Sequence, residues 1–108
     1  MKFLSRPEEL VLLAIWKIKN DPYGVTIRKY LSEFTDKYWS IGSVYVPLDR
    51  LEAKGFVKSY LADPTPERGG KSKRYYQLTP EGLAQLRELQ KIYETFWDDL
   101  SDLSTESL

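Results

Sequence analysis

The segment DPTPERGG at positions 63–70 constrains the fold most strongly, because its two prolines and adjacent glycines exclude the interior of a helix or strand. Short runs rich in aromatic and aliphatic residues flank it, at 56–61 and 73–78. Two such runs around a turn-forming segment predict an antiparallel β-hairpin. Four basic side chains lie at the predicted tip and on the returning strand, namely Arg68, Lys71, Lys73 and Arg74.

The residues before the hairpin begin with two predicted helices. Ser5 and Glu8 have the spacing of a capping box, with Pro7 in the first turn, so a helix is expected over about 7–19. That segment is apolar on most of its surface, and we expect it to be largely buried. Apolar residues at helical spacing predict a second helix over about 24–35.

A third helix is expected from Gly42 and Ser43, with Ser43 as its N-cap and Gly55 just beyond its end. Pro47 then falls near its fourth position, later than proline prefers, and is expected to distort the first turn. One predicted face is apolar and the other is exposed. The apolar face holds Val44, Leu48 and Leu51; the exposed face holds Ser43, Val46, Asp49, Arg50 and Ala53, with Tyr45 on its flank.

A long fourth helix is expected over about 80–103, because Thr79 is a good N-cap and Pro80 suits the first helical position. Its apolar residues are spaced as in a seam that packs against another helix. An exposed seam of this kind would be a liability, and symmetric pairing of two chains is the usual remedy. The predicted dimer interface therefore consists of Leu86, Leu89, Tyr93, Phe96, Trp97, Leu100 and Leu103.

The chain has neither cysteine nor histidine. This excludes disulfides, Cys/His zinc sites and histidine-based nucleophilic catalysis, so we expect no enzyme activity, metal or cofactor. The sequence has no run of about 18 apolar residues and no signal-peptide pattern, so we expect a cytosolic protein without a membrane partner. The net charge is zero, but residues 1–79 hold 14 Lys/Arg against 9 Asp/Glu, and residues 80–108 hold 2 against 7. A net +5 beside a net −5 indicates a basic face for a polyanion.

The expected order is three helices, two strands and a long helix. It predicts a mainly α fold with a small β-hairpin, a winged helix-turn-helix with a long C-terminal dimerisation helix. Residues 1–79 would form the DNA-binding domain, and residues 80–108 the dimerisation helix with a short tail. The third helix would enter the major groove of double-stranded DNA. The basic hairpin would act as a wing, because Lys and Arg neutralise phosphates and release counterions.

Four segments resemble the PadR family of bacterial transcriptional regulators: LVLLAI at 10–15, DPYGVTI at 21–27, SIGSVYVPLDRLEAKGFV at 40–57, and PTPERGGKSKRYYQLTPEGLAQL at 64–86. The resemblance implies a homodimeric winged-helix repressor with a single C-terminal helix, as in the family's smaller subtype. Such a dimer would place two recognition helices on a palindromic operator. Many members carry proline directly after the tyrosine of the third helix, whereas here Val46 intervenes before Pro47.

The candidate DNA contacts form two sets, with an alternative beside each. In the third helix they are Ser43, Tyr45, Val46 and Arg50, unless Tyr45 packs against the core and Arg50 pairs with Asp49 or Glu52. In the wing they are Arg68, Lys71, Lys73 and Arg74, unless the charge run is only a solvated loop. Trp97 and its aromatic neighbours could line a cavity for a flat hydrophobic effector, although plain packing is the commoner role of such a stripe. The alternative for the whole chain is a winged-helix protein-interaction module without a DNA role, against which the basic wing argues.

Overall fold

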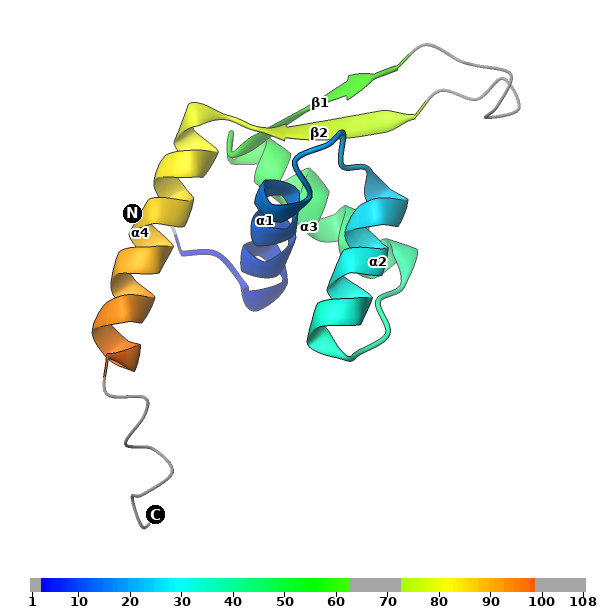
Figure 1. Ribbon diagram of the computed structural model, residues 1–108. Helices are drawn as coiled ribbons and strands as arrows, with labels where there is room; N and C mark the ends of the chain where they lie inside the picture. Colours follow the sequence, from blue (N-terminus) through cyan, green and yellow to red (C-terminus); the bar gives the residue numbers. More distant parts are fainter. Residues whose placement is uncertain (1–2, 63–72, 99–108) are drawn as a thin grey trace.

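The computed structural model describes residues 3–62 and 73–98, and in these ranges it has four helices and one two-stranded sheet. Figure 1 shows three helices packed below a β-hairpin, with the fourth helix descending at one side. This arrangement confirms the predicted mainly α fold with a small hairpin. The elements are, in chain order, α1 (Arg6–Ile18), α2 (Gly24–Thr35), α3 (Ile41–Ala53), β1 (Val57–Leu61), β2 (Arg74–Leu78) and α4 (Pro80–Trp97).

Side-chain caps fix the starts of the first two helices. The predicted capping box of α1 is present, because the Glu8 amide donates to Ser5 Oγ and the Ser5 amide donates to Glu8 Oε1, at 3.3 and 2.7 Å. Helix α2 has the predicted bounds, and the amide of its N-cap residue Tyr23 donates to Thr26 Oγ1 at 3.0 Å. Both helices therefore start with backbone N–H groups satisfied locally.

Helix α3 begins earlier than its sequence predicts. Its N-cap is Ser40, whose hydroxyl accepts from the Ser43 amide at 3.1 Å, so the assignment of Ser43 as the N-cap was wrong. The earlier start puts Pro47 well inside the helix, where it is buried and leaves the Ser43 carbonyl without the usual N–H partner. The predicted end is confirmed, because Gly55 follows α3 with a left-handed φ of 82°.

The hairpin is extended by the loop between α1 and α2. Strands β1 and β2 pair antiparallel, with Ser59 opposite Tyr76 and Leu61 opposite Arg74. On the other side of β2, Tyr23 forms an isolated bridge to Tyr75, and the Tyr76 amide donates to the Pro22 carbonyl at 2.9 Å. The helix-turn-helix pair is thereby tied to the returning strand of the hairpin.

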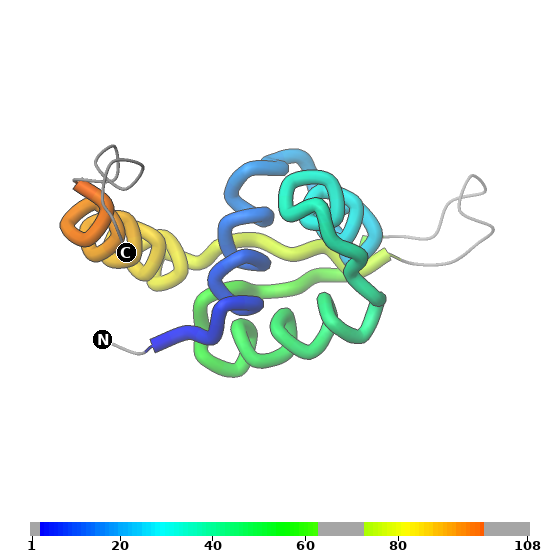
Figure 2. Tube along the Cα trace, turned by 90° about the horizontal axis from the view of Figure 1, so that it is seen from below, coloured from blue at the N-terminus to red at the C-terminus, as the bar shows by residue number. Residues whose placement is uncertain are grey.

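The hydrophobic core lies where α1, α2 and α3 meet the inner face of the hairpin. Helix α1 contributes four buried apolar residues to this core. Leu13 and Trp16 are 41% and 42% exposed, so the prediction that α1 is largely buried was wrong for the stripe that holds them. That stripe lies on the side toward α4, which stands away from the three-helix body in Figure 2. The buried apolar residues are Val11, Leu12, Ala14, Ile15, Ile27, Leu31, Val44, Leu48, Leu51, Phe56, Val57, Tyr76, Leu86 and Leu89.

Helix α4 is joined to β2 through Thr79 alone, and this junction is closely packed. Thr79 caps α4 as predicted, because its hydroxyl accepts from the Gly82 amide at 3.0 Å. The same residue donates from its hydroxyl to the Gly55 carbonyl at 2.6 Å and from its amide to the Phe56 carbonyl at 3.1 Å. A Cβ at Gly82 would run into that Phe56 carbonyl. The start of α4 is therefore fixed to the turn between α3 and β1.

The described part of α4 ends at Trp97, so the predicted extension to residue 103 lies outside the described residues. Among the helices of the ranges 3–62 and 73–98, none combines the length and the apolarity that crossing a bilayer requires.

Candidate nucleic-acid interface

Helix α3 presents a continuous exposed strip on the side away from the core. Its predicted inner face is confirmed, because Val44, Leu48 and Leu51 are fully buried. The predicted outer residues are all exposed, and they follow one another at helical spacing. They are Ser43, Val46, Asp49, Arg50 and Ala53.

Ser43 and Tyr45 differ in how far they are available to a ligand. The Ser43 hydroxyl is exposed but donates to the Ser40 carbonyl at 2.7 Å, so it is oriented by the first turn of α3. Tyr45 is half-buried against the core, and its hydroxyl end abuts Gly24 so closely that a Cβ there would overlap it. The structure thus gives Tyr45 the packing role that the sequence left open, between α3 and the start of α2.

The side chain of Arg50 is exposed in the middle of the strip. The alternative that it pairs with Asp49 or Glu52 is not seen, because no ion pair or hydrogen bond engages the Arg50 guanidinium within the described ranges. Arginine has five N–H donors in a planar fork, which suits bidentate contacts to an acceptor pair. Arg50 is therefore the cation of α3 that is free to meet a ligand among the described residues.

The two described wing cations point to opposite faces of the hairpin, as alternation along a strand requires. The Lys73 ammonium lies 4.2 Å from the ring centre of Tyr23 and donates to the Tyr23 hydroxyl at 3.1 Å. Arg74 instead lies on the face toward α3, since Tyr76, two residues further along, is buried on that face. The other two predicted wing residues, Arg68 and Lys71, lie outside the described residues.

A hydrogen-bonded chain joins Arg74 to α3. The Arg74 guanidinium donates from Nη1 to the Ser59 hydroxyl at 2.8 Å. The Ser59 hydroxyl donates in turn to Glu52 Oε2 on α3 at 2.6 Å. Neither Ser59 nor Glu52 was a candidate from the sequence, because contacts across a hairpin and a helix carry no local sequence signal.

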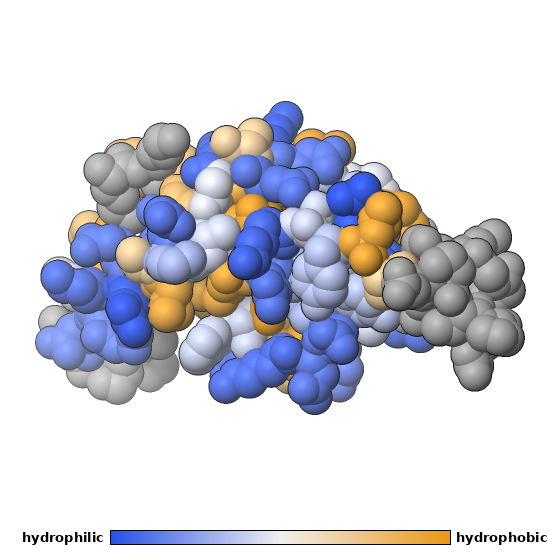
Figure 3. Space-filling view, turned by 90° about the horizontal axis from the view of Figure 1, so that it is seen from above, coloured by the Kyte–Doolittle hydropathy of each residue, from blue (hydrophilic) through white to orange (hydrophobic). Residues whose placement is uncertain are grey.

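Tyrosines anchor the base of the wing. Tyr76 is buried, and burial raises the pKa of its phenol to about 12. On the other face, Tyr75 packs between Tyr60 and Tyr23, with ring centres 5.6 and 5.7 Å away. Figure 3 looks down on this outer side, which is mostly hydrophilic, with hydrophobic residues in small separate areas. The hairpin is therefore held on both faces before its strands reach the loop.

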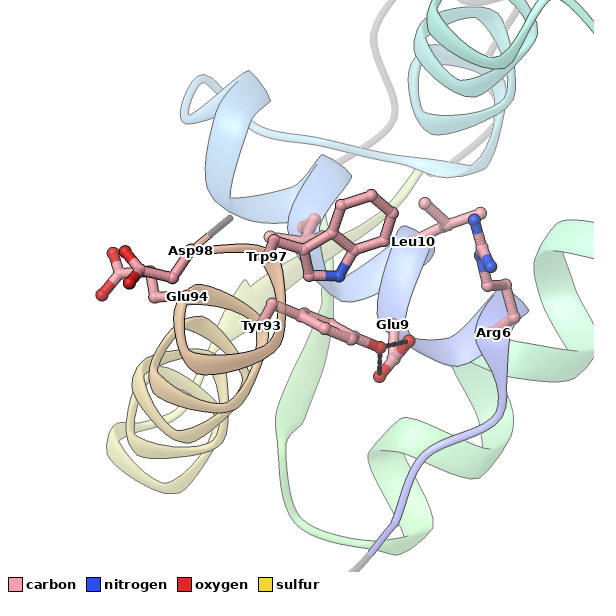
Figure 4. Close-up of a pocket in the computed structure, with 8 residues that line it drawn as sticks. Arg6, Glu9, Leu10, Tyr93, Glu94, Trp97 and Asp98 are labelled. Carbon is pink, nitrogen blue, oxygen red and sulfur yellow. Dashed lines mark hydrogen bonds between the residues drawn. The ribbon is translucent and has the colours of Figure 1, made fainter. Parts of the chain in front are cut away.

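A groove of about 690 Å³ separates the N-terminal half of α1 from the end of α4. Figure 4 shows Trp97 extending from α4 over the groove and Tyr93 pointing at Glu9 of α1. The Tyr93 hydroxyl donates to both Glu9 carboxylate oxygens at 2.7 Å, and this bond to a carboxylate raises the pKa of the Tyr93 phenol. The groove is thus apolar in its middle, where Leu10 and Leu13 line it, and charged at its rim.

The predicted dimer-interface residues divide into three groups. Leu86 and Leu89 are buried in the chain's own core, so they offer little surface to a partner. Tyr93, Phe96 and Trp97 are 43%, 79% and 55% exposed and form the apolar surface of the end of α4. Leu100 and Leu103 lie outside the described residues.

Three packed helices followed by a β-hairpin whose base is tied to the third helix define a winged helix-turn-helix, a fold of DNA-binding proteins. Residues 12–88 match the sequence profile of the Transcriptional regulator PadR-like family. The match covers more than half of the chain. The chain therefore belongs to the PadR-like family of transcriptional regulators.

Similar proteins agree with this assignment. A protein of Lysinibacillus sphaericus that is described as uncharacterized is 33% identical over 93 residues, which cover 84% of this chain and 82% of that protein. A PadR family transcription regulator from Clostridium difficile is 26% identical, with a TM-score of 0.69 over 94% of this chain and 100% of that chain. A PadR family transcriptional regulator from Eggerthella lenta is also 26% identical, with a TM-score of 0.70 over 91% of this chain and 83% of that chain.

Proposed function

We propose that this transcriptional regulator is a sequence-specific repressor that binds a palindromic DNA operator as a homodimer. The observation that carries the proposal is the exposed strip of α3 beside the Arg74 face of the hairpin. In this reading, Val46 and Arg50 meet base edges in the major groove, and Ser43 contacts DNA at the start of α3. The wing cations Arg68, Lys71, Lys73 and Arg74 bind phosphates.

Few of the proposed base contacts are charged, and Asp49 adds a negative charge to the same strip. Specificity would then rest on a small number of direct contacts, together with the shape and deformability of the operator. Arg50→Ala is expected to change sequence preference by roughly 1–3 kcal/mol if the guanidinium is bidentate to a guanine.

The experiment that tests the proposal is a salt titration of DNA binding. Fluorescence anisotropy of a labelled random-sequence duplex is measured for the wild type and for a variant with alanine at the four wing cations, from about 50 to 200 mM salt. The wild type is expected to bind with a steep salt dependence. The wing variant is expected to bind more weakly and to lose about 0.9 of the log–log slope for each phosphate contact removed.

A control variant removes the same number of exposed positive charges at positions other than the four wing cations. If affinity follows only net charge, the control and the wing variant will weaken equally, which would contradict a specific wing. No binding by the wild type at the lowest salt would refute the DNA-binding proposal and favour a protein-interaction module. The control carries alanine at Lys17, Lys58, Arg87 and Lys91, which are all exposed.

The proposed homodimer would bury the exposed end of α4. Tyr93, Phe96 and Trp97 form an aromatic surface that an isolated chain would leave in water, and symmetric pairing of two chains would cover it. A dimer of this kind would set two α3 helices on half-sites about 34 Å apart. The flanking groove, edged by Trp97, is also the place where a flat hydrophobic effector would bind.

Sedimentation at several dilutions tests the dimer with a matched pair of aromatic substitutions. Phe96→Ala is expected to shift the monomer–dimer equilibrium toward monomer. Phe34→Ala is the control, because Phe34 is 67% exposed at a place away from α4. Equal behaviour of the two variants would contradict the assignment of the end of α4 as the interface.

A further inference from the structure

The chain from Arg74 through Ser59 to Glu52 fixes the direction of a side chain that would otherwise be free. An exposed arginine has several rotatable bonds and loses that freedom when it binds a ligand. Here the guanidinium is already held by the Ser59 hydroxyl at 2.8 Å. Within residues 3–62 and 73–98, one of its five N–H donors has a partner, so the rest of the fork is available to a phosphate there.

The Ser59 hydroxyl has one donor and two acceptor positions. It donates to Glu52 and accepts from Arg74, so it uses positions of both kinds. Its hydrogen is directed to Glu52 at 2.6 Å, which leaves a lone pair for Arg74. Glu52 is on α3, only two residues from Arg50. The hydroxyl therefore sets the place of a wing cation relative to the recognition helix.

The two described wing cations are held by different helices. Lys73 is held by Tyr23 at the start of α2, whereas Arg74 is connected through Ser59 to α3. Lys73 has its ammonium against an aromatic ring, and Arg74 lies on the hairpin face that carries Ser59, whose hydroxyl bonds to Glu52 of α3. Of these two, Arg74 is thus the cation placed to contact the same stretch of duplex as α3.

We propose that Ser59 is a positioning residue for DNA binding, which orients Arg74 toward a phosphate beside the site read by α3. The inference rests on the proposed DNA-binding function. It assigns Ser59 no contact with DNA of its own. Its effect is expected to pass entirely through Arg74, and this makes it separable from a general effect on stability.

A double-mutant cycle on DNA affinity tests the inference, using the full chain and the labelled duplex described above. Ser59→Ala is expected to weaken binding about threefold to tenfold, because Arg74 must then be ordered during binding. The salt slope should stay that of the wild type, because the same phosphates are neutralised. Arg74→Ala should lower the slope by about 0.9. In the Arg74→Ala background, Ser59→Ala should have no further effect.

Two controls separate positioning from structure. Ser59→Thr keeps the hydroxyl and should restore most of the affinity, and thermal unfolding should confirm that each variant is folded. Lys58→Ala removes one charge from the neighbouring position on the other face of β1, and its double mutant with Ser59→Ala should be additive.

The outcomes distinguish the inference from the function on which it rests. If the wild type binds with a steep salt slope but Ser59→Ala binds equally well, the positioning role is overturned and the DNA-binding function stands. If Ser59→Ala weakens binding as much without Arg74 as with it, Ser59 acts by another route and the inference fails. If the wild type does not bind DNA, the DNA-binding function and the positioning role of Ser59 are both refuted.

Discussion

The ion pair between Glu8 and Lys54 gives the clearest prediction for stability. Glu8 is buried, with 4% of its side chain exposed, and its carboxylate accepts from Lys54 Nζ at 2.8 Å and from the Ser5 amide at 2.7 Å. Lys54 caps the end of α3, so the pair joins α3 to the first turn of α1. Lys54→Met keeps the length of the aliphatic chain and removes the charge, leaving a buried carboxylate with its Ser5 partner alone.

The expected loss follows from the burial of the two partners. Breaking an ion pair that is buried on both sides costs about 3–5 kcal/mol. The Lys54 side chain is 29% exposed, so water already solvates part of it, and the Ser5 hydrogen bond remains. We therefore expect Lys54→Met to lower the free energy of unfolding by about 1–2 kcal/mol at pH 7.

The loss should depend on pH in a direction set by Glu8. Burial pushes the pKa of Glu8 up, but the hydrogen bonds from Lys54 and Ser5 outweigh it, so the pKa lies below its ordinary value of 4.5. In the wild type this contribution is present above pH 4.5 and is lost as the pH falls through the folded-state pKa. In the variant, burial is less opposed, so the pKa should rise and the carboxyl should take up a proton on mild acidification. The difference in the free energy of unfolding between the wild type and Lys54→Met should shrink from pH 7 toward pH 4.

Urea unfolding followed by circular dichroism measures this difference at the two pH values. All samples are kept at one protein concentration, since association would shift the apparent stability. Lys58→Ala is the control, because it removes an exposed lysine and should change stability by less than about 0.5 kcal/mol. An equal loss for Lys54→Met at pH 7 and pH 4, or no loss at pH 7, would refute the reasoning.

Three further predictions concern packing and titration. Gly82→Ala should destabilise the fold by about 1–3 kcal/mol, because the new Cβ would overlap the Phe56 carbonyl, a backbone atom that cannot turn aside; an unchanged urea midpoint would contradict this. Leu86→Ala should cost about 2–5 kcal/mol in dilute samples, because Leu86 is buried in the chain's own core, whereas the exposed Phe96→Ala should cost less than about 0.5 kcal/mol there. The pKa of Tyr76 is raised from 10 to about 12, so its contribution to stability is complete below pH 10 and is lost as the pH rises through 12. In Tyr76→Phe, the absorbance titration at alkaline pH should lack the component with a pKa of about 12, and curves identical to those of the wild type would disprove the assignment.

The local features of the fold could be predicted because their signals lie within a few residues of one another. The capping box of α1, the bounds of α2 and the Thr79 cap of α4 all depend on spacings of three or four residues. The start of α3 was missed because Ser40 and Ser43 are both good N-caps, and Gly42 between them suggested a break. A hydrogen bond from Ser43 to Ser40 decided the choice, and composition does not reveal it.

The contacts between residues far apart in the sequence were beyond sequence reasoning for a different reason. Lys54 is 46 residues from Glu8, and Lys73 is 50 residues from Tyr23. Which partner such a cation meets depends on how the helices pack, and several partners of equal chemistry are available along the chain. The sequence could therefore place the wing cations on a hairpin. It could not predict that Lys73 is held at the start of α2 whereas Arg74 is connected to α3.

The tight junction at Thr79 makes α4 a lever arm. Its 18 described residues extend about 27 Å at 1.5 Å per residue, with no slack at the base to absorb rotation. A turn of about 5° at the junction would displace the tip by about 2.4 Å. Small changes beneath the Phe56 carbonyl would consequently become larger displacements of the side chains at the far end of the helix.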